Sequence, residues 1–209
     1  MQSTRLELVP LSKDHLPDYF SLRSDWEIEK WNRPQPITSI DEAEQELLGT
    51  LSSVDPTRDT YAILLRRDLD PKTIDRPQCT EATDNDSTSE NSTDSDTVLV
   101  PGGFVGFIGV YRLDQVPDVF YSIHRSAWGL GIATEALLTF TELFWKIYPH
   151  HYRLIGRCDT ENPASGRVME KSGFEYYDYI CADEFQPWMV PSARDSLRFV
   201  LVRPGYTLD

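Results

Sequence analysis

Residues 121–136 read YSIHRSAWGLGIATEA, and this stretch decides the fold. It begins like a half-buried strand, passes through a short polar turn, and places Gly129 and Gly131 just before an amphipathic helix. Apolar residues continue at helical spacing to Tyr148, and Pro149 ends the pattern. The first N–H groups of a helix have no internal partner and lie at its positive end. A strand that runs into a glycine turn at this point therefore predicts an anion site.

The glycine pattern alone does not identify the anion. A Walker loop requires Gly-Lys-Ser/Thr, which the sequence lacks here. A dinucleotide fingerprint requires a third glycine and an acidic residue at the end of a second parallel strand, and neither Glu142 nor Asp159 lies at such a place. Both of these motifs are excluded.

A second strand–helix unit follows directly. Residues 153–159, RLIGRCD, are typical of a strand. Asn162 is a good helix N-cap, Pro163 suits the first helical position, and Gly173 suits the residue after the helix. The sequence predicts a strand, a short capped helix and a further strand that begins near Phe174.

Together the two stretches resemble the GNAT superfamily of N-acetyltransferases, and in particular its RimJ/RimL-like branch, which acetylates protein N-termini and other amines. The matching patterns are Y-x-I…W-G-x-G-x-A-T-E-A-L over 121–137 and D-x-E-N-x-x-S-x-x-V-x-E-K-x-G-F over 159–174. Residues 5–10, 36–43 and 103–111 also fit. The resemblance implies a fold of class α+β (α/β), a GNAT-type mixed, mainly antiparallel seven-stranded sheet flanked by helices on both faces.

The remaining elements suit one domain over residues 1–209. We expect seven strands, at 5–9, 60–65, 104–110, 119–123, 153–159, 174–182 and 196–203, with the last two paired antiparallel. We expect helical structure over 14–31 and 41–51, in addition to the two helices above.

Residues 68–97 form an acidic insertion between two predicted strands. They hold nine acidic and two basic residues, so half of the chain's net charge of −14 lies here. Leu69 and Ile74 are its large aliphatic residues, too few to offset the entropy of ordering. We expect a disordered loop within one sheet, a solvated insertion in preference to a phosphorylated regulatory loop.

Composition limits the classes of function. No run approaches ~20 apolar residues, so we expect no membrane span. No secretory signal is visible, and Cys79, Cys158 and Cys181 have no metal or disulfide spacing, so we expect a metal-free cytoplasmic protein. Strong acidity argues against nucleic acid as a partner, because phosphate binding needs Lys and Arg.

The resemblance implies acetyl-CoA as the acyl donor, with its pyrophosphate held by main-chain N–H groups of the glycine loop. The implied binding residues are Ile123, Arg125, Trp128, Gly129, Leu130, Gly131, Ile132, Ala133, Thr134, Asn162 and Ser165. Trp128 has a structural alternative as a packing residue at the loop base, Arg125 as a solvated surface residue, and Asn162 as a helix N-cap, a role that is compatible with binding. Arg167 and Lys171 are further candidates for a phosphate contact.

The resemblance also implies a catalytic role for Ser165. Many members place a tyrosine a few residues later as general acid, but Val168 and Met169 stand here and neither can donate a proton. Ser165 would hydrogen-bond the leaving sulfur; the alternative is a first-turn serine bonded to the backbone. Tyr121 is expected in the core in preference to a position near the amine.

The sequence leaves the general base open between nearby carboxylates and an ordered water. The carboxylates are Asp159, Glu161, Asp183 and Glu184. Cys158 is not expected to act as a nucleophile, because direct transfer needs no covalent step. We expect the acceptor between the first two helices and the last hairpin, a region with acidic and aromatic residues that suit a cationic amine. These residues are Tyr19, Trp26, Glu27, Glu29, Trp31, Asp183, Glu184 and Trp188.

The sequence therefore predicts an acetyl-CoA-dependent N-acetyltransferase that acts on a primary amine, a protein N-terminus or a small cationic amine. The alternative is a non-catalytic acyl-CoA-binding or scaffold domain of the same fold. Transfer of a longer acyl group is a third possibility.

Overall fold

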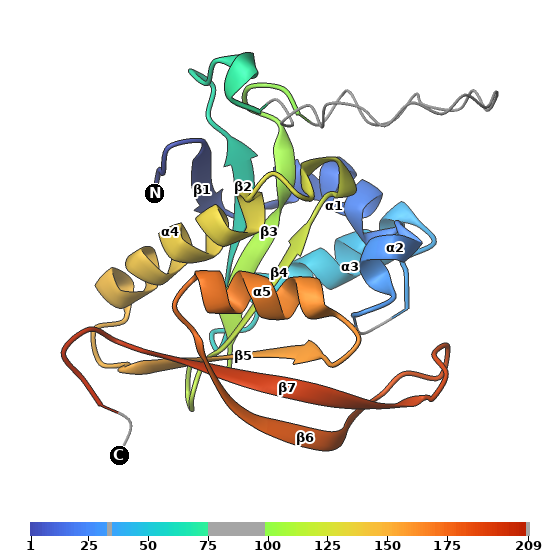
Figure 1. Cartoon of the computed structure of the whole chain (residues 1–209). Helices are drawn as coiled ribbons and strands as arrows, with labels where there is room; N and C mark the ends of the chain where they lie inside the picture. Colours follow the sequence, from blue (N-terminus) through green and yellow to red (C-terminus); the bar gives the residue numbers. More distant parts are fainter. Residues whose placement is uncertain (33–34, 75–98, 208–209) are drawn as a thin grey trace, which may run out of the picture.

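A computed structural model describes residues 1–32, 35–74 and 99–207 of the chain. Its centre is a seven-stranded sheet with the order β1-β2-β3-β4-β5-β7-β6 (Figure 1). Every neighbouring pair is antiparallel except β4 with β5. The strands are β1 Leu6–Pro10, β2 Asp59–Leu65, β3 Phe104–Tyr111, β4 Asp118–Ile123, β5 Arg153–Asp159, β6 Glu175–Phe185 and β7 Ala193–Val202. The predicted mixed, mainly antiparallel sheet is confirmed.

Helices cover both faces of the sheet (Figure 1). On one face lie α4, Ile132–Ile147, and α5, Pro163–Lys171, and on the other α1, Leu16–Arg23, α2, Trp26–Glu29, and α3, Ile40–Thr50. Side chains of β4 alternate between the two layers: Tyr121 and Ile123 pack with the α4 and α5 cluster, and Phe120 with the α1 and α3 cluster. The α5 helix approaches β5 closely because Gly156 has no Cβ; a Cβ there would lie 2.4 Å from Met169 Sδ.

The predicted helical region 14–31 is divided into three pieces. A 3₁₀ turn, Lys13–His15, precedes α1, and α2 begins again after Asp25. The Asp25 side chain accepts a hydrogen bond from the Glu27 N–H at 2.9 Å and caps α2. The Arg23 carbonyl accepts a bond from the Ile37 N–H at 3.1 Å in place of a helical partner. A tertiary contact and a local cap therefore end the continuous helix that the apolar pattern suggested.

The last two strands are longer than predicted and contain a bulge. The register between β6 and β7 shifts between Ile180 and Glu184, where Ala182 has a φ of 50°. Asp195 Oδ1 accepts a hydrogen bond from the Ala182 N–H at 2.8 Å and holds the bulge. At the hairpin tip, Trp188 Nε1 donates to the Lys30 carbonyl at 3.4 Å, so the hairpin reaches α2.

The acidic insertion joins β2 and β3, which are neighbours in the sheet. Its part from 75 to 97, where disorder was predicted, lies outside the described residues. The part before it differs from a featureless loop: Pro71–Ile74 form a 3₁₀ turn, Ile74 is buried, and Leu69 packs against the core. No helix of the described chain is long and apolar enough to cross a membrane.

Candidate active site

The parallel strands β4 and β5 pair over a short distance and then separate. Their register contains only Asp118 with Ile155 and Val119 with Gly156. The Ile155 N–H donates to the Pro117 carbonyl at 2.9 Å, so main-chain groups of odd-numbered β4 residues face β5. Beyond Val119, the main chain of Tyr121 therefore faces a place where no strand is paired with it. We call this place the β4–β5 split.

The glycine loop at the start of α4 is open. Gly129 and Gly131 have φ values of 77° and 74°, a conformation that favours glycine. A Cβ at Gly129 would meet no atom within 4 Å, so the loop has space beside it. Among the described residues no side chain caps α4. Its first-turn N–H groups, at the positive end of a 16-residue helix, can therefore receive an anion.

Arg5 holds the glycine loop through a hydrogen bond to its main chain. The sequence did not predict this role. Its Nη1 donates to the Leu130 carbonyl at 2.9 Å, and its Nη2 lies 3.6 Å from the place of a Cβ on Gly131. Glu135 holds Arg5 through the Arg5 N–H and Nε, both at 2.7 Å, and also accepts from Ser3 Oγ. The two residues are 130 positions apart. In the sequence, the pair could be recognised only from a basic residue at the start of a predicted strand, Arg5, and an acidic residue in the first turn of a predicted helix, Glu135.

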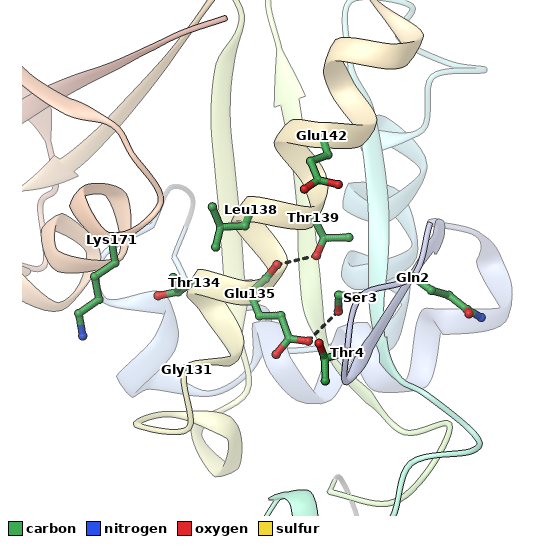
Figure 2. Close-up of a pocket in the computed structure, with 10 residues that line it drawn as sticks. All are labelled: Gln2, Ser3, Thr4, Gly131, Thr134, Glu135, Leu138, Thr139, Glu142 and Lys171. Atoms are coloured by element: carbon green, nitrogen blue, oxygen red, sulfur yellow. Dashed lines mark hydrogen bonds between the residues drawn. The ribbon is translucent and has the colours of Figure 1, made fainter. Parts of the chain in front are cut away.

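A groove of about 570 Å³ runs beside this support. Figure 2 shows Gly131, Thr134, Glu135 and Leu138 along α4, with Ser3 on one side and Lys171 of α5 on the other. Partial burial opposes ionisation of Glu135, but hydrogen bonds from Ser3 and Arg5 together lower its pKa. Lys171 lines the same groove as Gly131 and Thr134, and its contact with a phosphate stays a prediction. The charge of Glu135 is balanced by Arg5.

The start of α5 lies on the other side of the split and is closed. Asn162 Oδ1 accepts a hydrogen bond from the Ser165 N–H at 3.3 Å, and Pro163 occupies the first turn. The Ser165 Oγ lies 2.8 Å from the Tyr121 hydroxyl, which is also 3.3 Å from the Ser165 carbonyl. In the described chain, Ser165 Oγ has no backbone acceptor, so the reading of Ser165 as a first-turn serine bonded to the backbone is wrong.

The family match agrees with this arrangement. A model described as an acetyltransferase (GNAT) domain matches residues 5–175. This chain belongs to the GNAT acetyltransferases, in their RimJ/RimL-like branch. GNAT enzymes use acetyl-CoA.

Solved GNAT structures share the fold at low sequence identity. RimL, an acetyltransferase of a ribosomal protein's α-amino group, in complex with coenzyme A, has a TM-score of 0.70 at 16% identity, covering 98% of this chain and 97% of RimL. Spermidine N-acetyltransferase from Vibrio cholerae, solved with CoA and spermine, has a TM-score of 0.69 at 13% identity, with 96% and 97% covered. A GNAT acetyltransferase from Bacillus anthracis has a TM-score of 0.68 at 15% identity, with 97% of each chain covered. The search of curated proteins gave no match.

Within this GNAT fold, Trp128 ties the loop to the end of β4. The residue is 43% exposed, so its ring is only partly covered at the base of the loop. Its Nε1 donates to the Ile123 carbonyl at 2.8 Å. One main-chain group of Ile123 is thereby occupied, and the Ile123 N–H faces the split by the alternation of β4. Ala133 and Ile132 lie in the first turn of α4, as predicted.

Arg125 has a protein partner. Its Nε lies 2.6 Å from Asp25 Oδ2, so it links the turn before the GNAT loop to the capping residue of α2. The side chain is about half exposed. The coenzyme A contact of Arg125 stays a prediction, and a contact with phosphate would have to compete with Asp25.

The titratable groups near the split are largely engaged. Buried Arg194 binds Asp159 through two hydrogen bonds, at 2.7 and 2.8 Å, and lies 2.9 Å from Glu161. These two carboxylates are therefore poor candidates for a free base. Burial raises the pKa of the Cys158 thiol to about 11, so it is neutral near pH 7 and unsuited to act as a nucleophile. Asp183 Oδ2 lies 3.6 Å from Arg157 Nη1, is mostly buried, and belongs to the bulge of β6 between Ile180 and Glu184.

The structure brings together part of the region in which the acceptor is expected, and the acceptor's place there stays a prediction. The hairpin tip and α2 meet through Trp188 and Lys30, and Trp26 is 46% exposed. Tyr19 and Glu29 are buried, which corrects their expected place on this surface. Glu29 pairs with buried Arg23. Burial raises the pKa of Glu29 to about 7, against the opposing effects of Arg23 and Asn32.

Proposed function

We propose that this GNAT acetyltransferase transfers an acetyl group from acetyl-CoA directly to a primary amine, a protein N-terminus or a small cationic amine. One observation carries the proposal: the β4–β5 split lies between an open, uncapped start of α4 and the Ser165 hydroxyl of α5. The first can bind a pyrophosphate, and the second can hydrogen-bond the sulfur of a thioester that enters between them. The split thus has a group for the pyrophosphate of a coenzyme A thioester on one side and a group for its sulfur on the other.

In the proposed binding mode, main-chain N–H groups from Gly129 to Thr134 hold the pyrophosphate. Lys171 adds positive charge beside the first turn of α4, and Arg5 cancels the negative charge of Glu135 there. Ile123 and Asn162 offer hydrogen-bond donors to the pantetheine arm. The Asn162 side-chain N–H groups have that freedom because only its Oδ1 is used for the cap.

In the proposed reaction, the amine nitrogen forms a bond to the acetyl carbon and the carbon–sulfur bond breaks. Its electron pair stays on sulfur, and the proton lost from nitrogen ends on the thiolate through solvent. A hydrogen bond from Ser165 stabilises the charge that develops on sulfur. The acceptor would approach between α2 and the β6–β7 hairpin, where the exposed ring of Trp26 suits a cation. Glu27 lies in the same helix and is paired with Lys30 at 2.6 Å, so a cationic acceptor would compete with Lys30 for it. The spermidine N-acetyltransferase neighbour was solved with CoA and spermine, which supports this class of acceptor.

Thiol release from acetyl-CoA in the presence of peptide and polyamine panels tests the proposal. We expect release that depends on an acceptor, lost in Gly131→Glu and reduced about 10- to 100-fold in Ser165→Ala. Gly205→Glu is the matched control for charge at a left-handed glycine, since Gly205 has a φ of 90° and open space. Ser172→Ala controls for loss of a buried hydroxyl at the C-cap of α5.

Each other outcome has a defined meaning. Tight CoA binding without release would support the non-catalytic binding domain. Absence of CoA binding would contradict the function altogether. Faster thiol release from longer acyl-CoA donors than from acetyl-CoA would identify a different acyl donor, while acyl transfer to an amine would still hold. We also propose that residues 1–209 form a single domain of this kind with 68–97 as an insertion, located in the cytoplasm.

A further inference from the structure

The Tyr121 hydroxyl lies where the sequence left a donor missing. Val168 and Met169 replace the tyrosine that many members carry in this helix. Tyr121 comes instead from β4 and reaches across the split to α5. Its main chain faces the split, and its hydroxyl meets Ser165 at 2.8 Å. A phenol and a serine hydroxyl from two different elements thus meet beside the proposed path of the thioester.

We propose that Tyr121 is a positioning residue that fixes the proton of Ser165 toward the leaving sulfur. The inference rests on the proposed acetyl transfer. A serine hydroxyl has one proton and two lone pairs. When the Tyr121 hydroxyl donates to Ser165 Oγ, it occupies a lone pair and leaves the serine proton for the sulfur. A chain of two hydroxyls also polarises the second donor.

The surroundings support this direction of the bond. Burial raises the pKa of Tyr121 above its ordinary value, so the phenol keeps its proton near pH 7. It therefore remains a donor and does not become a base. Two oxygens lie within reach of the phenol proton: the Ser165 carbonyl at 3.3 Å, and Ser165 Oγ at 2.8 Å, where either hydroxyl can be the donor. The proposal takes the nearer oxygen, Ser165 Oγ, as the acceptor. Because no proton leaves Tyr121, the relay stabilises the thiolate by hydrogen bonding alone, and the proton balance of the transfer is unchanged.

The test measures the pKa of the coenzyme A thiol when it is bound to the protein. Thiolate ultraviolet absorbance is titrated against desulfo-CoA as the reference ligand, in a Cys79→Ser, Cys181→Ser background. A hydrogen bond to the thiolate lowers this pKa, so we expect a value below that of free CoA in the unaltered site. Ser165→Ala should raise it by about one unit, a tenfold change. Tyr121→Phe should raise it in the same direction.

The double variant distinguishes a relay from two separate donors. In a Ser165→Ala background, Tyr121→Phe should cause no further rise, because its effect passes through Ser165. Tyr61→Phe is the matched control: it removes another partly buried hydroxyl, bonded to Asp59 at 3.0 Å, from the same core cluster. It should leave the thiol pKa unchanged. With an acceptor, Tyr121→Phe should lower kcat several-fold without raising KM for acetyl-CoA.

Three results would overturn the inference and leave the proposed function standing. A thiol pKa that Tyr121→Phe leaves unchanged, while Ser165→Ala shifts it, would make Tyr121 purely structural. An equal shift in both backgrounds would make Tyr121 a direct donor. Equal shifts in Tyr121→Phe and Tyr61→Phe would indicate a general loss of packing. If CoA does not bind at all, the proposed function fails and the relay fails with it.

Discussion

The two helices that border the β4–β5 split begin in opposite ways. The α4 helix starts at Gly131 with a φ of 74°, and among the described side chains none caps it. The α5 helix starts at Asn162, whose side chain takes up the Ser165 N–H. Both follow a strand of the same parallel pair, so the sheet presents both helix ends to one place. The comparison shows what an anion site at a helix start needs: first-turn N–H groups that no side chain caps, and glycines that leave space beside them.

Giving α4 a side-chain cap should have the largest effect. In Gly131→Asp, a carboxylate competes for the first-turn N–H groups and repels a pyrophosphate, so we expect CoA affinity to fall about 100-fold. Gly131→Asn has the same shape, tolerates the left-handed conformation and carries no charge, so we expect about a tenfold loss. Calorimetry with CoA measures both. Equal losses in the two variants would show that charge at this position is not decisive.

Loss of the Arg5–Glu135 pair, which supports the glycine loop, should lower CoA affinity less than a cap on α4 does. Arg5 and Glu135 form a partly buried pair, with side chains 21% and 18% exposed. We expect Glu135→Gln to lower the free energy of unfolding by about 1–2 kcal/mol and CoA affinity about threefold to tenfold. The exposed Lys13–Glu44 pair provides the control, and Glu44→Gln should cost less than about 0.5 kcal/mol. Urea unfolding measures both.

This pair also predicts a pH dependence. The pKa of Glu135 is lowered in the folded state, so its contribution is complete above the ordinary value of 4.5. The contribution is lost as the pH falls through the folded pKa. Stability should therefore decline on acidification below pH 4.5 less steeply in Glu135→Gln than in the unaltered chain. Identical slopes would contradict the role of Glu135.

Substitution of Asn162, the N-cap of α5, should affect stability more than it affects CoA affinity. Asn162→Ala removes the cap and should cost about 1 kcal/mol. Asn162→Ser keeps a capping oxygen and loses the amide donor, so we expect near-normal stability and a loss of CoA affinity of about threefold. Thermal unfolding and calorimetry separate the two roles. Normal CoA affinity in Asn162→Ser would reduce Asn162 to a cap.

The smallest effect is expected at Cys158. This thiol lies beside Gly166 near the start of α5, yet burial raises its pKa to about 11. We expect Cys158→Ala to change the acetylation rate less than about twofold, since a neutral thiol takes no part. Alkylation against pH, without Cys79 and Cys181, should follow a thiolate that forms only as the pH approaches 11. A pKa below the ordinary 9.0 would show that the start of α5 attracts anions after all.

Local sequence signals predicted the fold wherever they agreed with the packing. The alternation of 119–123 and the helical spacing after Gly131 both appear in the structure, as β4 and α4. Residues 14–31 show the limit. Their apolar pattern continues through Asp25, but the Asp25 cap and the bond between Ile37 and Arg23 break the helix. The spacing of apolar residues shows which face of a helix is buried. It does not show that a backbone carbonyl, here that of Arg23, accepts a hydrogen bond from another segment in place of a helical partner.

The candidate site shows the same division. Gly129, Gly131 and Asn162 were predicted because glycine and cap positions carry their own local chemistry, whereas the role of Ser165 came from the resemblance to the GNAT superfamily. Arg5 was missed because its partner Glu135 is remote in sequence, and Tyr121 was assigned to the core because its ring is apolar. The ring does pack against the core, while the hydroxyl leaves it for Ser165.

The sequence by itself determined the family, the open glycine loop and the capped helix, since each depends on residues within a few positions of one another. Only the tertiary structure decided what lies on either side of the split. It joined Arg5 to the loop, Tyr121 to Ser165, Asp25 to Arg125 and Arg194 to Asp159. The physical reason is that hydrogen bonds and ion pairs act over about 3 Å in space, whatever the separation along the chain.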